Sequence, residues 1–311
     1  MWLITGGAGF IGSHLAARLV ADGQRVRVLD NFASGKLANL QAILPQIELV
    51  TGDVRDDAAA RAAMKGITVV LHQAAQPSVP LSVADPATTY SVNVTGTLNI
   101  LTAARDAGVR RVVLASTSAI YGDDPTSPKV ETMTPRPISP YASSKLADEQ
   151  LCSVFHSCYG LECVALRYFN VFGRGQDPNS AYAAVIPKMV DLLRRGERPV
   201  IFGDGEQTRD FIFVSDVVEA NLMAATAKVK PGSLYNIASG RPTSLNEVLR
   251  TLEQLLELSA TPDHHPERAG DIRHSLADVS KARLELGFTA RTSLEEGLAR
   301  TVGANRVASV A

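Results

Sequence analysis

The sequence predicts an α/β fold: a doubly wound parallel (Rossmann) sheet with a smaller C-terminal α/β lobe. Three observations carry this prediction. Apolar runs alternate with helical repeats through the first 170 residues, glycines stand at regular spacing behind the first apolar run, and the alternation breaks down after residue 170. Strands that alternate with helices form parallel sheets with helices on both faces. We therefore expect one domain over residues 1–170 and a smaller lobe over residues 171–311, with some crossing of the chain between them.

The predicted elements follow from hydrophobic periodicity. In the first part, strands are expected at 1–4, 26–29, 46–51, 67–72, 111–116 and 161–168. Helices are expected between them, at 12–23, 56–65, 86–108 and 141–159. Gly and Pro cluster after residue 170, and there we expect shorter helices at 182–195, 215–228, 244–258 and 293–304, with short strands near 199–202 and 234–237.

The turn after the first predicted strand contains Gly6, Gly9 and Gly12, and a helical repeat begins there. This layout is typical of a dinucleotide-binding βαβ unit. Gly6 would allow the sharp turn, Gly9 would let the main chain approach a pyrophosphate, and Gly12 would let the helix pack closely on the strand. The free N–H groups at the start of the helix would bind the phosphates. The alternative is a glycine-rich turn that binds nothing.

Asp30 ends the second predicted strand, eighteen residues after Gly12. A carboxylate at this place accepts hydrogen bonds from both hydroxyls of an adenosine ribose and would repel a 2′-phosphate, so NAD is favoured over NADP. An ordinary Asp at a strand end is the alternative. Asp53, Asn93 and the hydroxyl residues at 116–118 also lie at or near strand ends, where parallel sheets bind their ligands.

Tyr141 and Lys145 are the candidate catalytic residues, because a spacing of four places both on one face of the predicted helix 141–159. A cation one turn away favours the phenolate, so we expect Lys145 to lower the pKa of Tyr141 and make it an acid/base near neutral pH. A hydroxyl from Ser116, Thr117 or Ser118 would hydrogen-bond the substrate oxygen. A chance Tyr/Lys pair and a Ser/Thr turn that only caps the next element are the alternatives.

Composition narrows the function classes. The chain has 31 basic and 32 acidic residues, and it has no basic block, so neither nucleic acid nor an anionic membrane surface is an expected partner. No apolar run reaches the length of a membrane span. The three cysteines form no C-x-x-C pair, and no metal site is expected. Because Met1 leads directly into the first strand, no signal peptide is expected, and we predict a cytoplasmic protein.

These motifs resemble the extended short-chain dehydrogenase/reductase superfamily over nearly the whole chain. Within it, the sequence is similar to UDP-hexose 4-epimerases, and most similar to the branch that acts on UDP-N-acetylglucosamine. The residues that carry this resemblance are Gly6 to Gly12, Asp30-Asn31, Asp53-Val54, Ser116 to Gly122, Tyr141 with Lys145, Leu166 to Gly173, Gly173 to Asn179, Ala181 to Lys188, Gly203 to Glu206, Thr208 to Phe211 and Gly270 to Ser275.

The resemblance implies a role for each matching residue. Thr117 takes the place of the catalytic hydroxyl, with Ser118 as a neighbour that could share the role, beside Tyr141 and Lys145. The NAD site would be formed by Gly6, Gly9, Phe10, Ile11, Gly12, Asp30, Asn31, Asp53, Val54, Ala74, Asn93, Ser116, Tyr141, Lys145 and Tyr168. The UDP-sugar would contact Ser78, Thr117, Asn170, Val185, Arg209, Arg268, Asp271 and Ser275. Without the motif, each of these two arginines could equally be a partner in a surface ion pair.

Two substitutions bear on the reaction within this superfamily. Related sugar-nucleotide 4,6-dehydratases carry an Asp-Glu pair where this chain has Ser118 and Ala119, so dehydration is disfavoured. Epimerases restricted to unacetylated sugars commonly carry a bulky aromatic residue where this chain has Ser275. A small side chain there leaves room for a 2-acetamido group, although Ser275 could simply be a small loop residue, because one side chain changes specificity only modestly.

The function implied is NAD-dependent C4 epimerisation of UDP-hexoses through a transient 4-keto sugar, for UDP-GlcNAc and UDP-GalNAc and for the unacetylated pair. The alternatives are a UDP-glucuronate 4-epimerase or decarboxylase and a nucleotide-sugar 4-reductase on the same scaffold, and more remotely a non-catalytic NAD-binding protein. The resemblance also implies a homodimer that pairs the helices 86–108 and 141–159 of each subunit.

Overall fold

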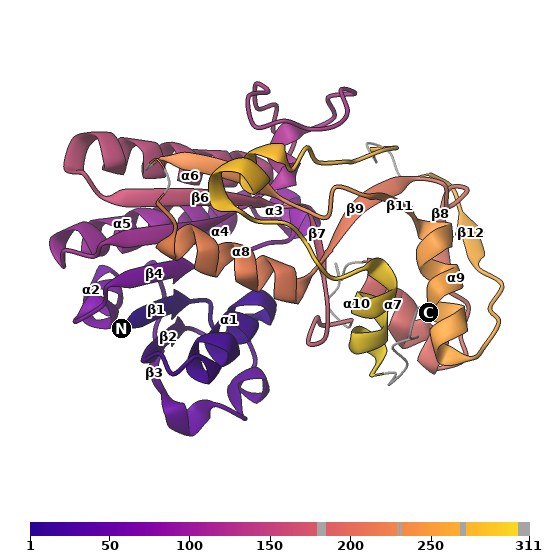
Figure 1. Ribbon diagram of the computed structural model, residues 1–311, viewed down its shortest axis with the longest axis horizontal. Coiled ribbons are helices and arrows are strands. Elements are labelled where there is room, and N and C mark those ends of the chain that lie inside the picture. Colours follow the sequence, from indigo (N-terminus) through magenta and orange to yellow (C-terminus); the bar gives the residue numbers. More distant parts are fainter. Residues whose placement is uncertain (179–184, 229, 231, 268–271, 304–311) are drawn as a thin grey trace.

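The central element of the computed structural model is a sheet of seven parallel strands (Figure 1), and the structure describes residues 1–178, 185–228, 230, 232–267 and 272–303. The strand order is β10-β6-β5-β4-β1-β2-β3. The bounds are β1 (Trp2–Thr5), β2 (Val26–Asp30), β3 (Ile47–Thr51), β4 (Val69–His72), β5 (Arg111–Thr117), β6 (Glu162–Tyr168) and β10 (Ser233–Ile237). This sheet confirms the predicted Rossmann-type α/β fold, including the change of direction at β1 that defines double winding.

Helices cover both faces of the sheet, which explains why its strands read as nearly continuous apolar runs. Alternate strand residues point to opposite faces. On one face, Ile4, Val28 and Val113 share a core with α1 (Phe10–Ala21) and α8 (Val214–Thr226). On the other, Leu3, Val70 and Val112 share a core with α2 (Asp57–Met64), α5 (Gly96–Asp106) and α6 (Pro140–Tyr159).

The predicted helix 86–108 is in fact three consecutive pieces. After the short α3 (Val79–Ala84), the chain forms α4 (Pro86–Tyr90), a π-helical turn over Ser91–Thr95, and then α5. The Asp85 carboxylate caps α4 by accepting from the Thr88 N–H at 3.0 Å. The π-helical turn carries Asn93, and such turns within helices are frequent at functional sites.

The predicted helix 141–159 is confirmed as α6, with local signals at both ends. The Ser139 hydroxyl accepts from the Ala142 N–H at 3.1 Å, and Pro140 occupies the first turn, where its missing N–H costs nothing. Gly160 ends the helix in the left-handed region at φ 72°, which glycine adopts without strain.

The smaller lobe has its own aromatic core of Phe172, Phe211 and Phe213, joined by Leu298. It contains a three-stranded sheet of β11 (Pro242–Ser244), β9 (Thr208–Phe213) and β7 (Asn170–Phe172), and a pair formed by β8 (Val200–Phe202) and β12 (Asp263–His265). Its helices are α7 (Val185–Arg194), α9 (Leu245–Leu256) and α10 (Leu294–Val302). The four helices predicted after residue 170 are found as α7, α8, α9 and α10.

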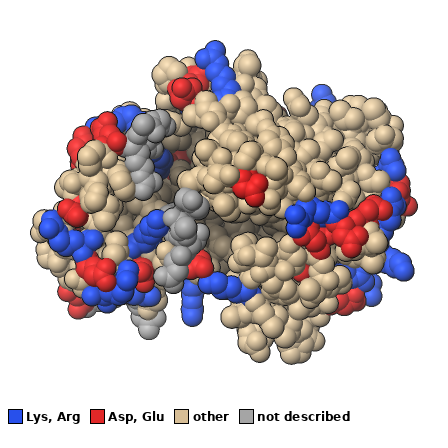
Figure 2. All heavy atoms as spheres, turned by 180° about the vertical axis from the view of Figure 1, so that it is seen from behind, with Lys and Arg blue, Asp and Glu red and all other residues tan. Residues whose placement is uncertain are grey.

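The chain returns from the smaller lobe to the large sheet, because α8 packs on α1 and β10 pairs with β6 (Figure 1). A division into domains at residue 170 stays a prediction. Figure 2 shows Lys, Arg, Asp and Glu side chains of both signs interspersed over one face of the molecule. In the part of the chain that the structure describes, no helix is long and apolar enough to cross a membrane.

Candidate active site

The glycine turn between β1 and α1 has the geometry predicted from its sequence. Gly6 adopts φ 65°, and a Cβ on it would lie 2.7 Å from the Ala74 nitrogen. A Cβ on Gly12 would lie 2.8 Å from the Gly7 Cα, so α1 packs this closely on the turn only because residue 12 is glycine. Gly9 precedes α1 and has no side chain to cap it, so no N-cap side chain occupies the first N–H groups of the helix. This turn fits a pyrophosphate.

Asp30 lies at the end of β2, where its carboxylate holds the glycine turn in place. One oxygen accepts from the Ala8 N–H at 2.9 Å and the other from the Phe32 N–H at 2.8 Å. Each carboxylate oxygen has a second lone pair, so both can still accept from a ribose hydroxyl. The arrangement therefore fits the ribose role predicted for Asp30, which stays a prediction.

Asn31 and Asp53 lie next to one another at the ends of β2 and β3. The Asn31 amide donates to Asp53 at 2.8 Å. Arg55, which the sequence analysis did not identify, donates to the same carboxylate through Nε at 2.9 Å and Nη2 at 2.7 Å. Hydrogen bonds from Arg55 hold the pKa of Asp53 well below its usual range, so this carboxylate stays ionised. No periodic pattern in the sequence marks Arg55.

Several other residues predicted for the cofactor lie around the same strand ends. Val54 is buried against Gly96, and the Ala74 N–H donates to the Thr5 hydroxyl at 3.2 Å. Phe10 and Ile11 are half-buried against the aromatic core of the smaller lobe. Direct contacts of these residues with NAD stay predictions.

Asn93 and Tyr168 are held by protein partners. The Asn93 side chain accepts from the Gln76 N–H at 2.8 Å and donates to the Ser144 hydroxyl at 2.9 Å. It thereby ties the π-helical turn to α6. The Tyr168 hydroxyl donates to Asn221 at 3.0 Å, and burial raises the pKa of Tyr168 to about 12. A contact of either residue with NAD stays a prediction.

Tyr141 and Lys145 lie on one face of α6, as predicted, beside Thr117 at the end of β5. The expected sign of the Tyr141 pKa shift is wrong. Burial raises the pKa of Tyr141, and the Lys145 cation and a hydrogen bond with Thr117 lower it by less. Lys145 thus acts in the predicted direction, but the loss of hydration of the phenolate outweighs it.

Lys145 has a partner that the sequence analysis missed. Its ammonium donates to the Asp148 carboxylate at 2.7 Å, and the two side chains are 2% and 0% exposed. The signal was present in the sequence, because residues three apart on a helix are neighbours. Tyr141, Lys145 and Asp148 therefore form one stripe along α6.

The three hydroxyl residues at the end of β5 and just after it do not all face the ligand crevice as expected. Successive strand residues point to opposite faces. The Ser116 hydroxyl points into the core and donates to Glu149 at 2.6 Å, and Glu149 also binds Arg167 at 2.9 and 2.8 Å. Thr117 is half-buried beside Tyr141, and its hydroxyl accepts from the Ala119 N–H at 3.2 Å. Ser118 begins the 3-10 turn Ser118–Tyr121.

In the smaller lobe, β9 gathers the residues predicted to bind the nucleotide. Asn170 lies on β7, which pairs with β9, and its amide donates to the Asp210 carbonyl at 3.2 Å. Arg209 donates to the Thr208 carbonyl at 2.9 Å. The Ser275 N–H donates to the same carbonyl at 3.1 Å, which brings Ser275 next to Arg209.

The other predicted substrate residues are more dispersed. Val185 begins α7, and the Ser78 hydroxyl caps α3 by accepting from the Leu81 N–H at 3.2 Å. Arg268 and Asp271 lie outside the described residues. Lys36 and Asp177 form an ion pair of 2.7 Å between the loop after β2 and the smaller lobe, which the sequence analysis did not foresee because 141 positions separate them.

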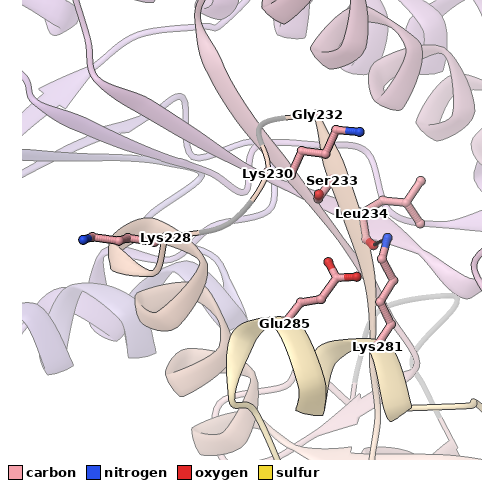
Figure 3. Close-up of a pocket in the computed structure, with 7 residues that line it drawn as sticks. All are labelled: Lys228, Lys230, Gly232, Ser233, Leu234, Lys281 and Glu285. Carbon is pink, nitrogen blue, oxygen red and sulfur yellow. Dashed lines mark hydrogen bonds between the residues drawn. The ribbon is translucent and has the colours of Figure 1, made fainter.

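A separate pocket of about 630 Å³ lies at the start of β10 (Figure 3). It is lined by Lys228, Lys230, Gly232, Ser233, Leu234, Lys281 and Glu285. Lys281 already donates to the Leu234 carbonyl at 2.9 Å. The pocket is at the opposite edge of the parallel sheet from the carboxyl ends of β1, β2 and β5, so it is not part of the candidate active site.

Comparison with known proteins agrees with this geometry. Residues 2–238 match the model of the NAD dependent epimerase/dehydratase family. A UDP-glucose 4-epimerase of Mycolicibacterium smegmatis is 40% identical over 304 residues, covering 96% of each chain. The structure of a UDP-N-acetylglucosamine 4-epimerase from Methanobrevibacter ruminantium, in complex with UDP-N-acetylmuramic acid, is 39% identical. It aligns with a TM-score of 0.93 over 97% of this chain and 96% of that one.

A Thermus thermophilus UDP-glucose 4-epimerase in complex with NAD is 37% identical and has a TM-score of 0.88, with 97% of this chain and 98% of that chain covered. These matches, together with the glycine turn, confirm the superfamily and the cofactor predicted from the sequence. The chain belongs to the NAD-dependent epimerase/dehydratase family, and its cofactor is NAD.

Proposed function

We propose that this protein interconverts UDP-hexoses that differ in configuration at C4, with UDP-GlcNAc and UDP-GalNAc among its substrates. The observation that carries the proposal is the position of Tyr141. It lies beside Thr117 at the carboxyl end of β5, two strands from the glycine turn that follows β1. An acid/base group is therefore held at the edge of the sheet where a dinucleotide would bind.

In this mechanism Tyr141 moves the proton of the C4 hydroxyl. The Tyr141 oxygen takes the proton as the sugar is oxidised and gives it back as the sugar is reduced. The Thr117 hydroxyl hydrogen-bonds the Tyr141 oxygen and would also hydrogen-bond the C4 oxygen of the sugar. Bound NAD supplies the acceptor and the donor for the hydride at C4. Arg209 would hold the diphosphate, since the guanidinium fork binds phosphate oxygens in pairs. The sugar ring could then turn over while the nucleotide stays anchored.

The residues after β5 favour epimerisation over dehydration. Ser118 and Ala119 begin the 3-10 turn beside Thr117, and neither carries a carboxyl group. Expulsion of the C6 hydroxyl needs a general acid at that place. Ser275 supports an acetylated substrate, because it is a small residue held next to Arg209.

The test is to incubate the purified protein with UDP-GlcNAc, without added NAD, and to separate the products by anion-exchange chromatography. UDP-GalNAc at a fixed equilibrium ratio is the expected result. Conversion of UDP-glucose but not UDP-GlcNAc would keep the mechanism and reject the argument from Ser275. Failure with both sugars would reject this proposal, and UDP-glucuronate and a 4-reductase assay would be tried next.

We also propose that the protein is a homodimer in the cytoplasm. The helical segment that contains α4 and α5 lies beside α6, and exposed apolar side chains lie along these helices: Tyr90 at 40%, Leu98 at 41% and Val154 at 50%. Pairing of such faces from two subunits would bury them. Light scattering should give twice the chain mass of 33.1 kDa, and Val154→Asp should shift the protein toward monomer. A parent protein that is monomeric at micromolar concentration would reject the dimer.

A further inference from the structure

The stripe Tyr141, Lys145 and Asp148 places two opposite charges on the buried face of the catalytic helix. The residues are at i, i+4 and i+7, so their side chains follow one another along the same face. Lys145 and Asp148 are joined at 2.7 Å and are shielded from solvent. Neither charge can be screened by salt as a surface pair would be.

The groups around this pair are neutral or already compensated. From β4, His72 is buried, and burial together with the nearby Lys145 lowers its pKa to about 3, so it is neutral at pH 7. From β6, Tyr168 is protonated, the Cys163 thiol is buried against Cys152 of α6, and Arg167 is paired with Glu149. Among the described residues, the charges that act on Tyr141 are therefore those of Lys145 and Asp148.

Stability does not explain why a carboxylate lies here. Burying an ion pair costs more hydration than the attraction returns in many proteins, and apolar replacements are often as stable. Burial raises the pKa of the Asp148 carboxyl, and hydrogen bonds and the charge of Lys145 act against this effect. The place of the pair on the same face of α6 as Tyr141 therefore calls for a reason other than stability.

We propose that Asp148 is a positioning residue of the reaction, which fixes the Lys145 ammonium on the stripe and offsets part of its charge so that Tyr141 can return the proton it takes. The inference rests on the proposed function, because a reversible epimerisation needs one residue that serves as base and then as acid. Lys145 favours the phenolate, the form that the first task needs. Asp148 acts in the opposite sense, since its charge raises the pKa of Tyr141.

The size of the effect follows from the helix geometry. Seven residues at a rise of about 1.5 Å place the backbones of Tyr141 and Asp148 roughly 10 Å apart along the helix, which we take as the scale of the distance between the two side-chain groups. At an effective dielectric constant of about 20, a unit charge at that distance shifts a pKa by about one unit. Removing the charge of Asp148 should therefore increase the ratio of ionised to protonated Tyr141 about tenfold at a fixed alkaline pH.

The test compares the parent with Asp148→Asn, which keeps an oxygen acceptor for Lys145 but loses the charge. Phenolate absorbance is measured at about pH 9.5, and the same measurement on versions that also carry Tyr141→Phe is subtracted, which isolates Tyr141 from the other tyrosines. The acid limb of the kcat profile should move about one pH unit lower. Asp106→Asn, which removes an exposed carboxylate from α5, is the control and should change neither quantity.

Two further variants complete the test: a second uncharged residue and a residue that restores the carboxylate. Asp148→Ser, whose hydroxyl also accepts from Lys145, should give the same shift if Asp148→Asn does not fold. Asp148→Glu restores a carboxylate and should return the absorbance toward that of the parent. An unchanged Tyr141 ionisation in a folded uncharged variant would overturn the proposal, even if the enzyme epimerises UDP-sugars. The absorbance needs no turnover, so a shift without any epimerase activity would reject the proposed function and leave the electrostatic role of Asp148 standing.

Discussion

Gly12→Ala should destabilise the protein, because the methyl group has no space. Its Cβ would lie 2.8 Å from the Gly7 Cα and 2.9 Å from the Gly6 carbonyl carbon, and closer still to the Gly6 carbonyl oxygen. These are main-chain atoms, so no side chain can rotate away, and α1 must move off the turn by roughly half an ångström or more. Overpacking of this kind costs about 1–3 kcal/mol, of which the higher helix propensity of alanine returns up to about 1 kcal/mol. We expect a net loss of about 1–2 kcal/mol.

The matched variant is Gly9→Ala in the same turn. Gly9 has φ −75° and ψ 177°, which any residue adopts, and an added Cβ would meet only the Gly6 oxygen at 3.2 Å. Urea unfolding should show this variant within about 0.5 kcal/mol of the parent. Calorimetric titration should show weaker NAD binding, because the methyl group would lie where we predict that the pyrophosphate approaches. A Gly12→Ala protein as stable as the parent would refute the packing argument.

Three further predictions concern the site and its surroundings. Tyr141→Phe should lower kcat by about 100-fold or more while NAD binding is retained, and near-parent activity in that variant would reject the acid/base role. Ser275→Tyr should reduce kcat/KM for UDP-GlcNAc more than for UDP-glucose, and equal losses would show that residue 275 does not set specificity. His72 has a folded pKa of about 3, below its unfolded value of about 6.5, so the unfolded chain binds the extra proton between these values. The free energy of unfolding should therefore fall as the pH drops below about 6.5, by about 2 kcal/mol between pH 6.5 and 5. Urea unfolding at these two pH values should show a smaller loss of unfolding free energy for His72→Gln.

The sequence predicted most of the large sheet and the helices on it, because those elements carry strong apolar periodicity. It missed β7, β9, β11 and β12 in the smaller lobe. Three of these strands have three residues each, too few for alternation to register. Their pairing depends on contacts between distant segments, such as β11 with β9, rather than on a local pattern.

The candidate site likewise contains residues that local sequence rules identified and residues that these rules missed. The turn glycines, Asp30 and the Tyr141/Lys145 pair lie at strand ends or at helix spacings, so local rules were enough to find them. Arg55 was missed because its role comes from where β3 ends relative to Asn31. The expected direction of the Ser116 hydroxyl was wrong because the strand continues to Thr117, which turns that hydroxyl toward Glu149, while a contact of Ser116 with NAD stays a prediction.

The sign of the Tyr141 shift has a consequence for how the site works. A motif of Tyr and Lys four apart suggests a tyrosine that a cation shifts toward the phenolate, but burial raises the pKa of Tyr141 by more than Lys145 lowers it, and the Asp148 charge raises it further. Tyr141 is then mainly protonated at neutral pH in the protein itself, and its phenolate, once formed, is a stronger base. Epimerisation at C4 changes neither the net charge nor the oxidation state of the sugar, so its two half-reactions need opposite proton transfers at one oxygen. Lys145 and Asp148 act on Tyr141 in opposite senses, so the buried pair adjusts how readily this oxygen takes the proton and how readily it returns it.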